Sequence, residues 1–192
     1  MGTPNWLDHS ELPAWLTFIA VVERLPRQLD AQLQRDAGDT HFEYMAMAML
    51  SDAPDRTLRM TRLAALTHST LPRLSHVLAR LVERGYVRRV PCPEDKRATN
   101  AVLTEAGWTH LQAVAPGHVA TVRTLVIDPL SPEQVSQLRT IGESILGRLE
   151  DCDPTGAIPT SRVTPAVAPR DIGDTPTDDL VAGVREGPLG EV

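Results

Sequence analysis

The stretch Leu63–Thr104, LAALTHSTLPRLSHVLARLVERGYVRRVPCPEDKRATNAVLT, decides the fold of this chain. Its first apolar positions predict a short helix, which a turn joins to a second helix, Leu71–Arg84. Thr70 is a suitable N-cap for the second helix, and Gly85 ends it. Two short strands around the tip PCPEDKR follow. This order predicts a winged helix-turn-helix.

Positive charge gathers in the same part of the chain. Ten Arg and Lys and three acids lie between Arg56 and Arg97, so this segment has a net charge of +7 in a chain whose net charge is -6. A phosphate backbone meets one face of a protein, not its average charge. The acidic balance of the whole chain therefore does not exclude DNA as a partner.

The second helix and the wing carry the side chains expected to bind DNA. Arg73 can pair with both acceptors of a guanine edge, and Ser75 and His76 can reach a base or a phosphate. Arg97 has the length and charge to enter a minor groove from the wing, and Asp95 can hold Arg97 or another arginine in an extended pose. A single helix-surface arginine is more often only a solvated charge, and the local concentration of charge argues against that interpretation here. The expected DNA-binding residues are Arg73, Ser75, His76, Arg80, Arg88, Arg89, Lys96 and Arg97, with Asp95 as the brace.

Helical patterns flank this stretch on both sides. Apolar residues recur every three or four positions over about 12–37, 41–50, 105–126 and 132–149. Ser131, Pro132 and Gln134 form the start signal of the last of these helices. The sequence therefore predicts a mainly α protein with a small β-wing. Arg80 and Arg84, further along the second helix, are expected to contact phosphates or to form internal ion pairs.

The segments LAAL, RLVERGYVRR, PEDKR and LTEAG resemble the multiple-antibiotic-resistance regulator (MarR) family of bacterial transcription factors. The resemblance covers about residues 10–150. It implies a DNA-binding lobe over about 54–104 and helices over about 10–38 and 105–150 that pair two subunits. It further implies a homodimer that binds a pseudo-palindromic operator, often as a repressor. Arg97 matches the wing arginine of the family and Asp95 its partner, while Arg73 and His76 match positions that usually contact bases.

Two departures from the family pattern limit what the resemblance implies. His68 and Ser69 occupy a turn where the family often has Gly and an apolar residue, and Ala79 replaces an acid common in the recognition helix. Operator preference is therefore not transferable.

The resemblance also implies a small, often aromatic, effector bound between the dimerisation helices and the winged helix. Each candidate is also readily explained as a core, capping or surface residue. The side chains expected to line such a site are Trp15, His41, Tyr44, Met45 and His118.

A DNA-binding regulator has three alternatives. A winged helix can serve as a protein-interaction module whose basic face meets an acidic partner. Cys92 lies between two prolines near basic side chains of the wing, which suggests a redox-responsive regulator, although a lone cysteine is usually incidental. An enzyme is not indicated, because the sequence has no nucleophile with an oriented base, phosphate-binding glycine loop or metal-ligand cluster. No cofactor and no metal are expected.

The two ends of the chain carry no functional motif. The N-terminus lacks the pattern of a secretion signal, and no apolar stretch is long enough to span a membrane, so a soluble, cytoplasmic protein is expected. Residues 151–192 contain six Pro and five Gly and have no helical period. They are expected to form a disordered acidic tail, either passive or competing with DNA for the basic face.

Overall fold

The computed structural model describes residues 4–93 and 95–151, so the predicted tail lies outside the described residues except for Asp151. The described part is mainly helical with one small antiparallel sheet, as the sequence predicts. Its elements are α1 (Glu11–Ala37), α2 (His41–Ser51), η1 (Pro54–Arg56), β1 (Thr57–Arg59), α3 (Met60–Leu66), α4 (Leu71–Glu83), β2 (Val87–Cys92), β3 (Asp95–Leu103), α5 (Glu105–Val122), η2 (Arg123–Ile127) and α6 (Pro132–Asp151).

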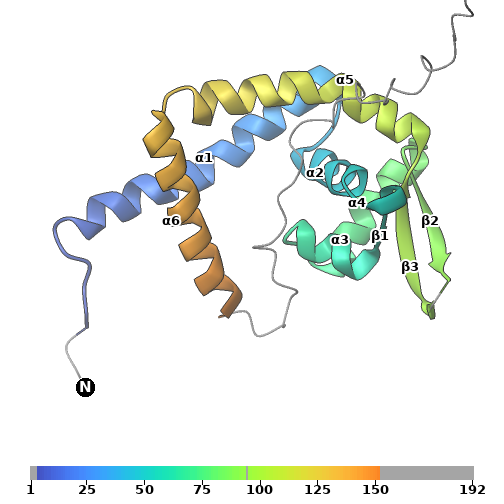
Figure 1. The fold of residues 1–192 in the computed structure, drawn as a ribbon, viewed down its shortest axis with the longest axis horizontal. Helices are drawn as coiled ribbons and strands as arrows, with labels where there is room; N and C mark the ends of the chain where they lie inside the picture. The colour runs from blue at the N-terminus through green and yellow to red at the C-terminus, as the bar shows by residue number, and fades with distance from the viewer. Residues whose placement is uncertain (1–3, 94, 152–192) are drawn as a thin grey trace, which may run out of the picture.

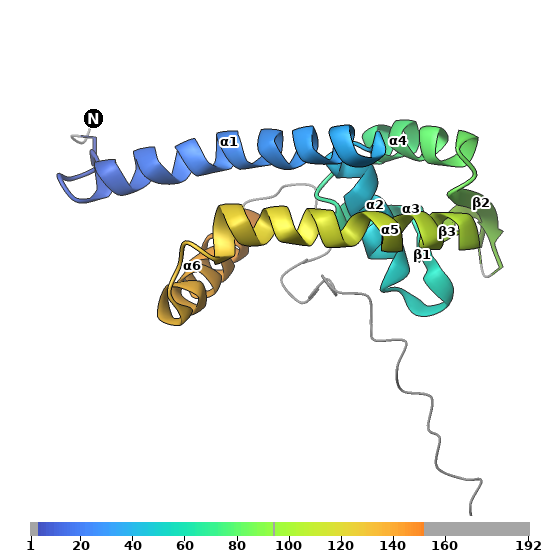
Figure 2. The ribbon, with the colours of Figure 1, turned by 90° about the horizontal axis from the view of Figure 1, so that it is seen from above.

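Two long helices, α1 and α5, form an arm that extends from the lobe containing the sheet. α1 and α5 lie side by side along the long axis (Figures 1 and 2). α2, α3, α4 and the sheet form a lobe at one end of this pair, and α6 turns away at a steep angle at the other end (Figure 1). The winged helix-turn-helix therefore sits at the end of a helical arm.

Side-chain caps fix where the helices begin. The predicted caps at Thr70 and Ser131 are confirmed, because each hydroxyl accepts a backbone N–H from the first turn of the following helix. Thr104 caps α5 in the same way. α2 starts with a reciprocal capping box, in which Thr40 and Glu43 each bond the other's backbone N–H. These caps set the positions at which the chain turns between one helix and the next.

The wing is a hairpin with a third strand added to it. The strand order is β1-β3-β2, and every pairing is antiparallel. β2 pairs with β3 from Val87 opposite Leu103 to Pro91 opposite Thr99, and the register then shifts so that Cys92 faces Asp95. The strands thus reach closer to the tip than the sequence indicates. β1, three residues long, was not predicted from sequence, because it gains its partners only from β3.

The core lies inside the lobe and continues to the α1–α5 pair. One stripe of α4 is fully buried and packs among apolar residues of α2, α3 and the strands. Together these side chains exclude water from the junction of the lobe with the helical arm. The fully buried aliphatic and methionine side chains of this core include Leu33, Met47, Leu50, Leu63, Leu74, Leu78, Leu81 and Val87.

The described helices are those of a protein with no membrane-spanning segment in this part of the chain. Over residues 4–93 and 95–151, no helix combines the length and the apolar character needed to cross a bilayer.

Candidate nucleic-acid interface

One face of α4 is buried and the opposite face is presented outward. Leu74, Leu78 and Leu81 are fully buried, which fixes the rotation of the helix about its axis. Arg73 and His76 are consequently exposed, as the sequence predicts for residues that read base edges. The other exposed positions of the helix include Leu71, Pro72, Ala79 and Arg80.

The turn before α4 contains a residue in an unusual conformation. His68 has a φ of 47°, in the left-handed region that favours glycine. This is the turn position at which the sequence departs from the family pattern. The strain is local, because the adjacent backbone N–H groups of Thr67 and Ser69 still bond to carbonyls of α3.

The wing is tied to α4 by an arginine. The Arg89 guanidinium donates a hydrogen bond to the carbonyl oxygen of Ser75. Between the wing and the start of α4 lies a groove of about 470 Å³. Three arginines from three elements, Arg59, Arg89 and Arg97, line it. The groove also contains Met60, Thr61, Leu71, Ser75, Asp95, Ala98 and Thr99.

Asp95 organises the tip of the wing through two contacts. One carboxylate oxygen accepts the backbone N–H of Arg97 at 3.0 Å, and the other forms an ion pair with Arg59. The predicted brace of Asp95 on Arg97 therefore acts through the backbone, and the charge of Asp95 is paired with an arginine of β1. The side chain of Arg97 is exposed at the groove.

Two residues predicted to contact DNA, Arg73 and Arg80, contact other side chains of the protein in the structure. The Arg73 guanidinium carbon lies 4.9 Å from the centre of the Phe42 ring, a cation–π contact with α2. Arg80 lies with its Nε 3.2 Å from Oε1 of Glu43, a carboxylate with no exposure to solvent. Arg80 is about half exposed, so this contact leaves part of its guanidinium open to solvent.

The remaining predicted DNA-binding residues lie on the two strands of the wing. Arg88 is exposed on β2, where it pairs in register with Val102. Lys96 lies on β3 next to Asp95. Arg88, Arg89 and Arg97 thus come from both strands of the hairpin.

Four of the five residues predicted for an effector site lie close together, and the fifth, Trp15, lies apart from them. His41 and Met45 line a pocket of about 440 Å³ between α1, α2 and the start of α4. Tyr44 and His118 pack ring to ring behind it, with centroids 4.3 Å apart, and the His41 ring is 5.6 Å from that of His118. Trp15 lies near the start of α1, away from this pocket, where it is 49% exposed and beside Phe18. The sequence did not indicate the other pocket residues, Pro26, Arg27, Asp30, Phe42, Leu66, Thr67, His68 and Arg73.

Burial perturbs the titratable rings of this cluster. Desolvation, with a smaller repulsion from His41, lowers the pKa of His118 to about 4. Desolvation also lowers the pKa of His41, against the opposing charge of Asp30, and it raises the pKa of Tyr44. His118 is therefore neutral at physiological pH, where its Nδ1 shares a hydrogen bond with Gln32 of α1.

Cys92, the residue behind the redox interpretation, is 8% exposed at the end of β2. Access for an oxidant therefore requires the hairpin to open locally. No group of three His, Cys, Asp or Glu side chains suited to a metal ion occurs within residues 4–93 and 95–151.

Comparison with known proteins gives consistent relatives. The MarR family model matches residues 39–98. The chain is similar to Sco3205, a MarR family transcriptional regulator from Streptomyces coelicolor crystallised in complex with DNA, with 42% identity, a TM-score of 0.73 and coverage of 83% of this chain and 98% of that chain. It is also similar to AbsC, another MarR family transcriptional regulator from Streptomyces coelicolor. The identity is 37%, the TM-score is 0.74, and the match covers 77% of this chain and 99% of AbsC.

A more distant relative is the transcriptional regulator PecS of Dickeya dadantii, which is 35% identical over 77 residues. That match spans 40% of this chain and 43% of PecS.

The fold and the exposed helix with its wing define a winged helix-turn-helix protein with helical extensions on both sides. The chain belongs to the MarR family of transcriptional regulators.

The neutral His118 makes stability depend on pH. Its pKa lies at about 4 in the folded protein and near 6.5 in the unfolded chain, so the unfolded chain binds the extra proton. The stabilisation is complete above pH 6.5 and is lost as the pH falls toward 4. We expect the free energy of unfolding to fall by up to about 3 kcal/mol across this window. Chemical denaturation at a series of pH values measures it.

His118→Gln should remove most of this loss, since glutamine does not titrate. His9→Gln, in the exposed N-terminal segment outside the cluster, is the matched control and should retain the slope of the wild type. An unchanged slope in His118→Gln would show that other groups cause the acid sensitivity.

Proposed function

We propose that this protein is a homodimeric, sequence-specific DNA-binding regulator that represses transcription and is released by a small aromatic effector. The observation that carries the proposal is the groove between α4 and the wing, where Arg59, Arg89 and Arg97 surround an exposed helix start. Arginines from separate elements that face one groove are suited to phosphates and narrow grooves. The DNA complex of the related Sco3205 supports the same function.

The geometry suits a helix in the major groove and a hairpin in the minor groove. α4 offers its N-terminal turns, with Arg73, Ser75 and His76, to base edges. The wing extends beyond it with Arg97 near the tip, where an arginine can enter a minor groove. Arg88, Arg89 and Lys96 then contact the phosphates on either side. Two such units in a dimer bind half-sites about 34 Å apart.

Arg73 has to leave Phe42 in order to reach a base. A cation–π contact at an exposed site contributes about 0.5–1 kcal/mol, whereas a bidentate contact with guanine contributes about 1–3 kcal/mol of discrimination. The exchange is therefore favourable on the correct sequence. It is unfavourable where the base does not present two acceptors.

We expect two arginine variants to weaken DNA binding in different ways. On an operator selected from a random-sequence library, Arg73→Ala should cost about 1–3 kcal/mol and relax the preference at one base pair. Arg97→Ala should lower affinity for all sequences and reduce the salt slope of log K by about one. Fluorescence anisotropy at several salt concentrations measures both.

The matched control is Arg123→Ala, which removes an arginine from η2, where it pairs with Asp128 at the surface. It should bind as the wild type does. Failure of the wild type to enrich any sequence would favour the protein-interaction module instead.

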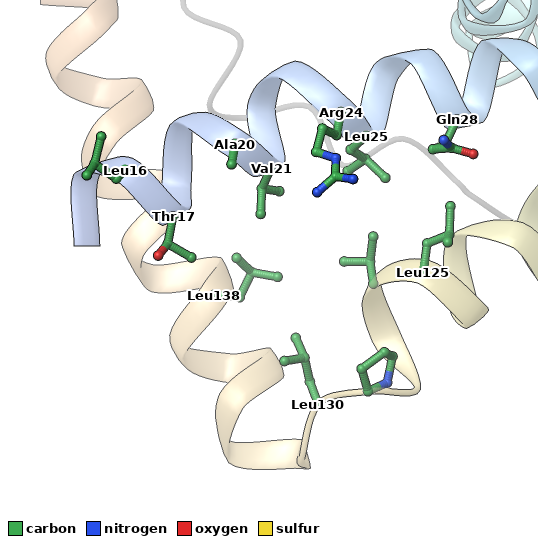
Figure 3. A pocket seen from close by; sticks show the side chains of 12 residues that line it. Leu16, Thr17, Ala20, Val21, Arg24, Leu25, Gln28, Leu125, Leu130 and Leu138 are labelled. Carbon is green, nitrogen blue, oxygen red and sulfur yellow. The ribbon is translucent and has the colours of Figure 1, made fainter. Parts of the chain in front are cut away.

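Homodimerisation is proposed from an uncovered apolar groove. The groove, about 770 Å³, lies between α1, the end of η2 and α6, and aliphatic side chains from all three elements face it (Figure 3). A set of large apolar side chains continues along both helices, and exposed patches of this extent mark interfaces. The exposed members on α1 and α6 are Leu12, Trp15, Leu16, Phe18, Val21, Val22, Leu138, Ile141, Leu146 and Leu149.

Val21→Asp should convert the dimer to a monomer. Val21 is exposed in the single subunit, so the charge costs little there, whereas at a dimer interface it would be buried without a partner. Sedimentation velocity at micromolar concentration distinguishes the two states. Ala113→Asp, at an exposed position of α5 outside the groove, should remain dimeric. A wild-type monomer would rule out the proposed assembly.

The effector is proposed to bind the pocket beside Arg73. The ring of Phe42 offers a stacking surface, and the basic side chains of Arg27 and Arg73 outnumber the single acid, Asp30. This composition suits an aromatic acid. Such a ligand would hold Arg73 at the pocket and so withdraw it from DNA.

We expect 2-hydroxybenzoate to lower operator affinity, because it competes with DNA for Arg73. A titration of the protein–operator complex followed by anisotropy measures this. Cyclohexanecarboxylate has the same charge without the aromatic ring and should be weaker. Arg27→Gln removes a positive charge from the part of the pocket wall formed by α1. It should reduce the loss of operator affinity that 2-hydroxybenzoate causes. Equal responses of the wild type and Arg27→Gln would place the effector elsewhere.

A further inference from the structure

Two carboxylates are fully buried at the connection between α1 and α2. Asp39 follows Gly38, which ends α1 with a φ of 69°, and Glu43 lies in the first turn of α2. Both have 0% exposure. Buried carboxylates require partners, because desolvation of an unpaired charge is costly.

Both partners come from the recognition helix α4 and its C-cap. Arg84 donates a hydrogen bond to Asp39 at 2.6 Å, and the Nε of Arg80 lies 3.2 Å from Oε1 of Glu43, an ion pair without hydrogen-bond geometry. Arg80 and Arg84 are four residues apart and therefore lie on one face of the helix. Partial burial lowers the pKa of Arg84, but the hydrogen bond and charge of Asp39 more than offset this and raise it.

The same cluster reaches α5. The second oxygen of Asp39 lies 2.7 Å from Nε2 of His110. The ring of Tyr86 stacks on His110 with centroids 4.4 Å apart, and the guanidinium of Arg84 lies 4.6 Å from the Tyr86 ring. Asp39 thus joins the end of α1, the end of α4 and α5.

Polar contacts of this kind fix an orientation that apolar packing leaves adjustable. The leucine stripe of α4 is held by apolar burial, which is not directional. Small slides and tilts of the helix therefore change the stabilisation from burial only a little. Charge-assisted hydrogen bonds depend on distance and angle. Buried ion pairs add little net stability against their desolvation, and their best-attested role is to specify one arrangement.

The anchor is at the opposite end of α4 from the residues that read DNA. Arg84 and Arg73 are separated by about 16 Å along the helix axis, from a rise of 1.5 Å per residue. A tilt of about 10° at the anchor would move the reading end by about 3 Å, close to the rise of one base pair.

We propose that the cluster of Asp39, Glu43, Arg80 and Arg84 sets the angle of the recognition helix relative to α1 and α5 and so determines which half-site spacing the dimer accepts. This inference rests on the proposed function, because it requires a dimer that binds two half-sites. The cluster acts by positioning the helix, not by contacting bases.

The test measures binding to operators whose central spacing is changed in steps of one base pair. The wild type should prefer one spacing over its neighbours by about tenfold, the loss expected when one bidentate base contact is missed. Asp39→Asn/Arg84→Met removes one ion pair without leaving a buried unpaired charge. It should bind several spacings within about threefold of one another while retaining its preference within each half-site.

Two further variants make the outcome decisive. Arg80→Lys/Arg84→Lys keeps both charges but not the guanidinium geometry, so it should fall between the wild type and the double variant, and it carries the test if the double variant does not fold. Arg123→Gln removes a surface ion pair outside the cluster and should keep the wild-type optimum. Circular dichroism and sedimentation confirm folding and dimerisation for each.

An unchanged spacing optimum in folded, dimeric variants of the cluster would overturn the inference and leave the proposed function intact. Absence of operator binding by the wild type would refute the proposed function itself.

Discussion

The candidate interface depends on the burial of one stripe of α4. Leu74, Leu78 and Leu81 have no exposure, and burial of each such side chain contributes about 1.5–3 kcal/mol. Because a helix has 3.6 residues per turn, burying this stripe determines which residues face outward. The hydroxyl of Thr104 then bonds to the carbonyl oxygens of Gly85 and Tyr86, so the end of the wing is fixed to the end of the same helix.

The ten basic residues of the central segment divide into two sets once their partners are known. Arg56, Arg59, Arg80 and Arg84 each face a carboxylate. Three of those carboxylates lie outside the segment, so counting charge along the sequence overstates the positive charge available to DNA. Arg59 lines the groove together with its partner Asp95, whereas the pairs of Arg56, Arg80 and Arg84 lie outside the groove lining, so the positive field there is narrower than a uniform basic patch.

Local signals made much of the fold predictable. Helix starts at Thr70 and Ser131 depend on residues within one turn, and the leucine spacing of α4 indicates its buried face directly. Long-range pairings were not predictable in this way. The partners of Arg80 and Arg84 precede them by 37 and 45 residues, and a carboxylate at the end of α1 reads as an ordinary turn residue. The capping box of Thr40 and Glu43 was not predicted, and it explains only one of the two oxygens of Glu43.

Arg73 joins the effector pocket and the DNA-binding surface in the proposed function. Its guanidinium cannot stack on Phe42 and reach a base edge at once, so binding at one site is coupled to the other. The coupling is limited to the difference between the two contacts, which is on the order of 1–2 kcal/mol, or about a 5- to 30-fold change in affinity. A larger response would require α4 itself to move, and the buried carboxylates at its far end oppose that movement. An effector acting through Arg73 alone should therefore weaken binding to each half-site without changing the spacing that the dimer accepts.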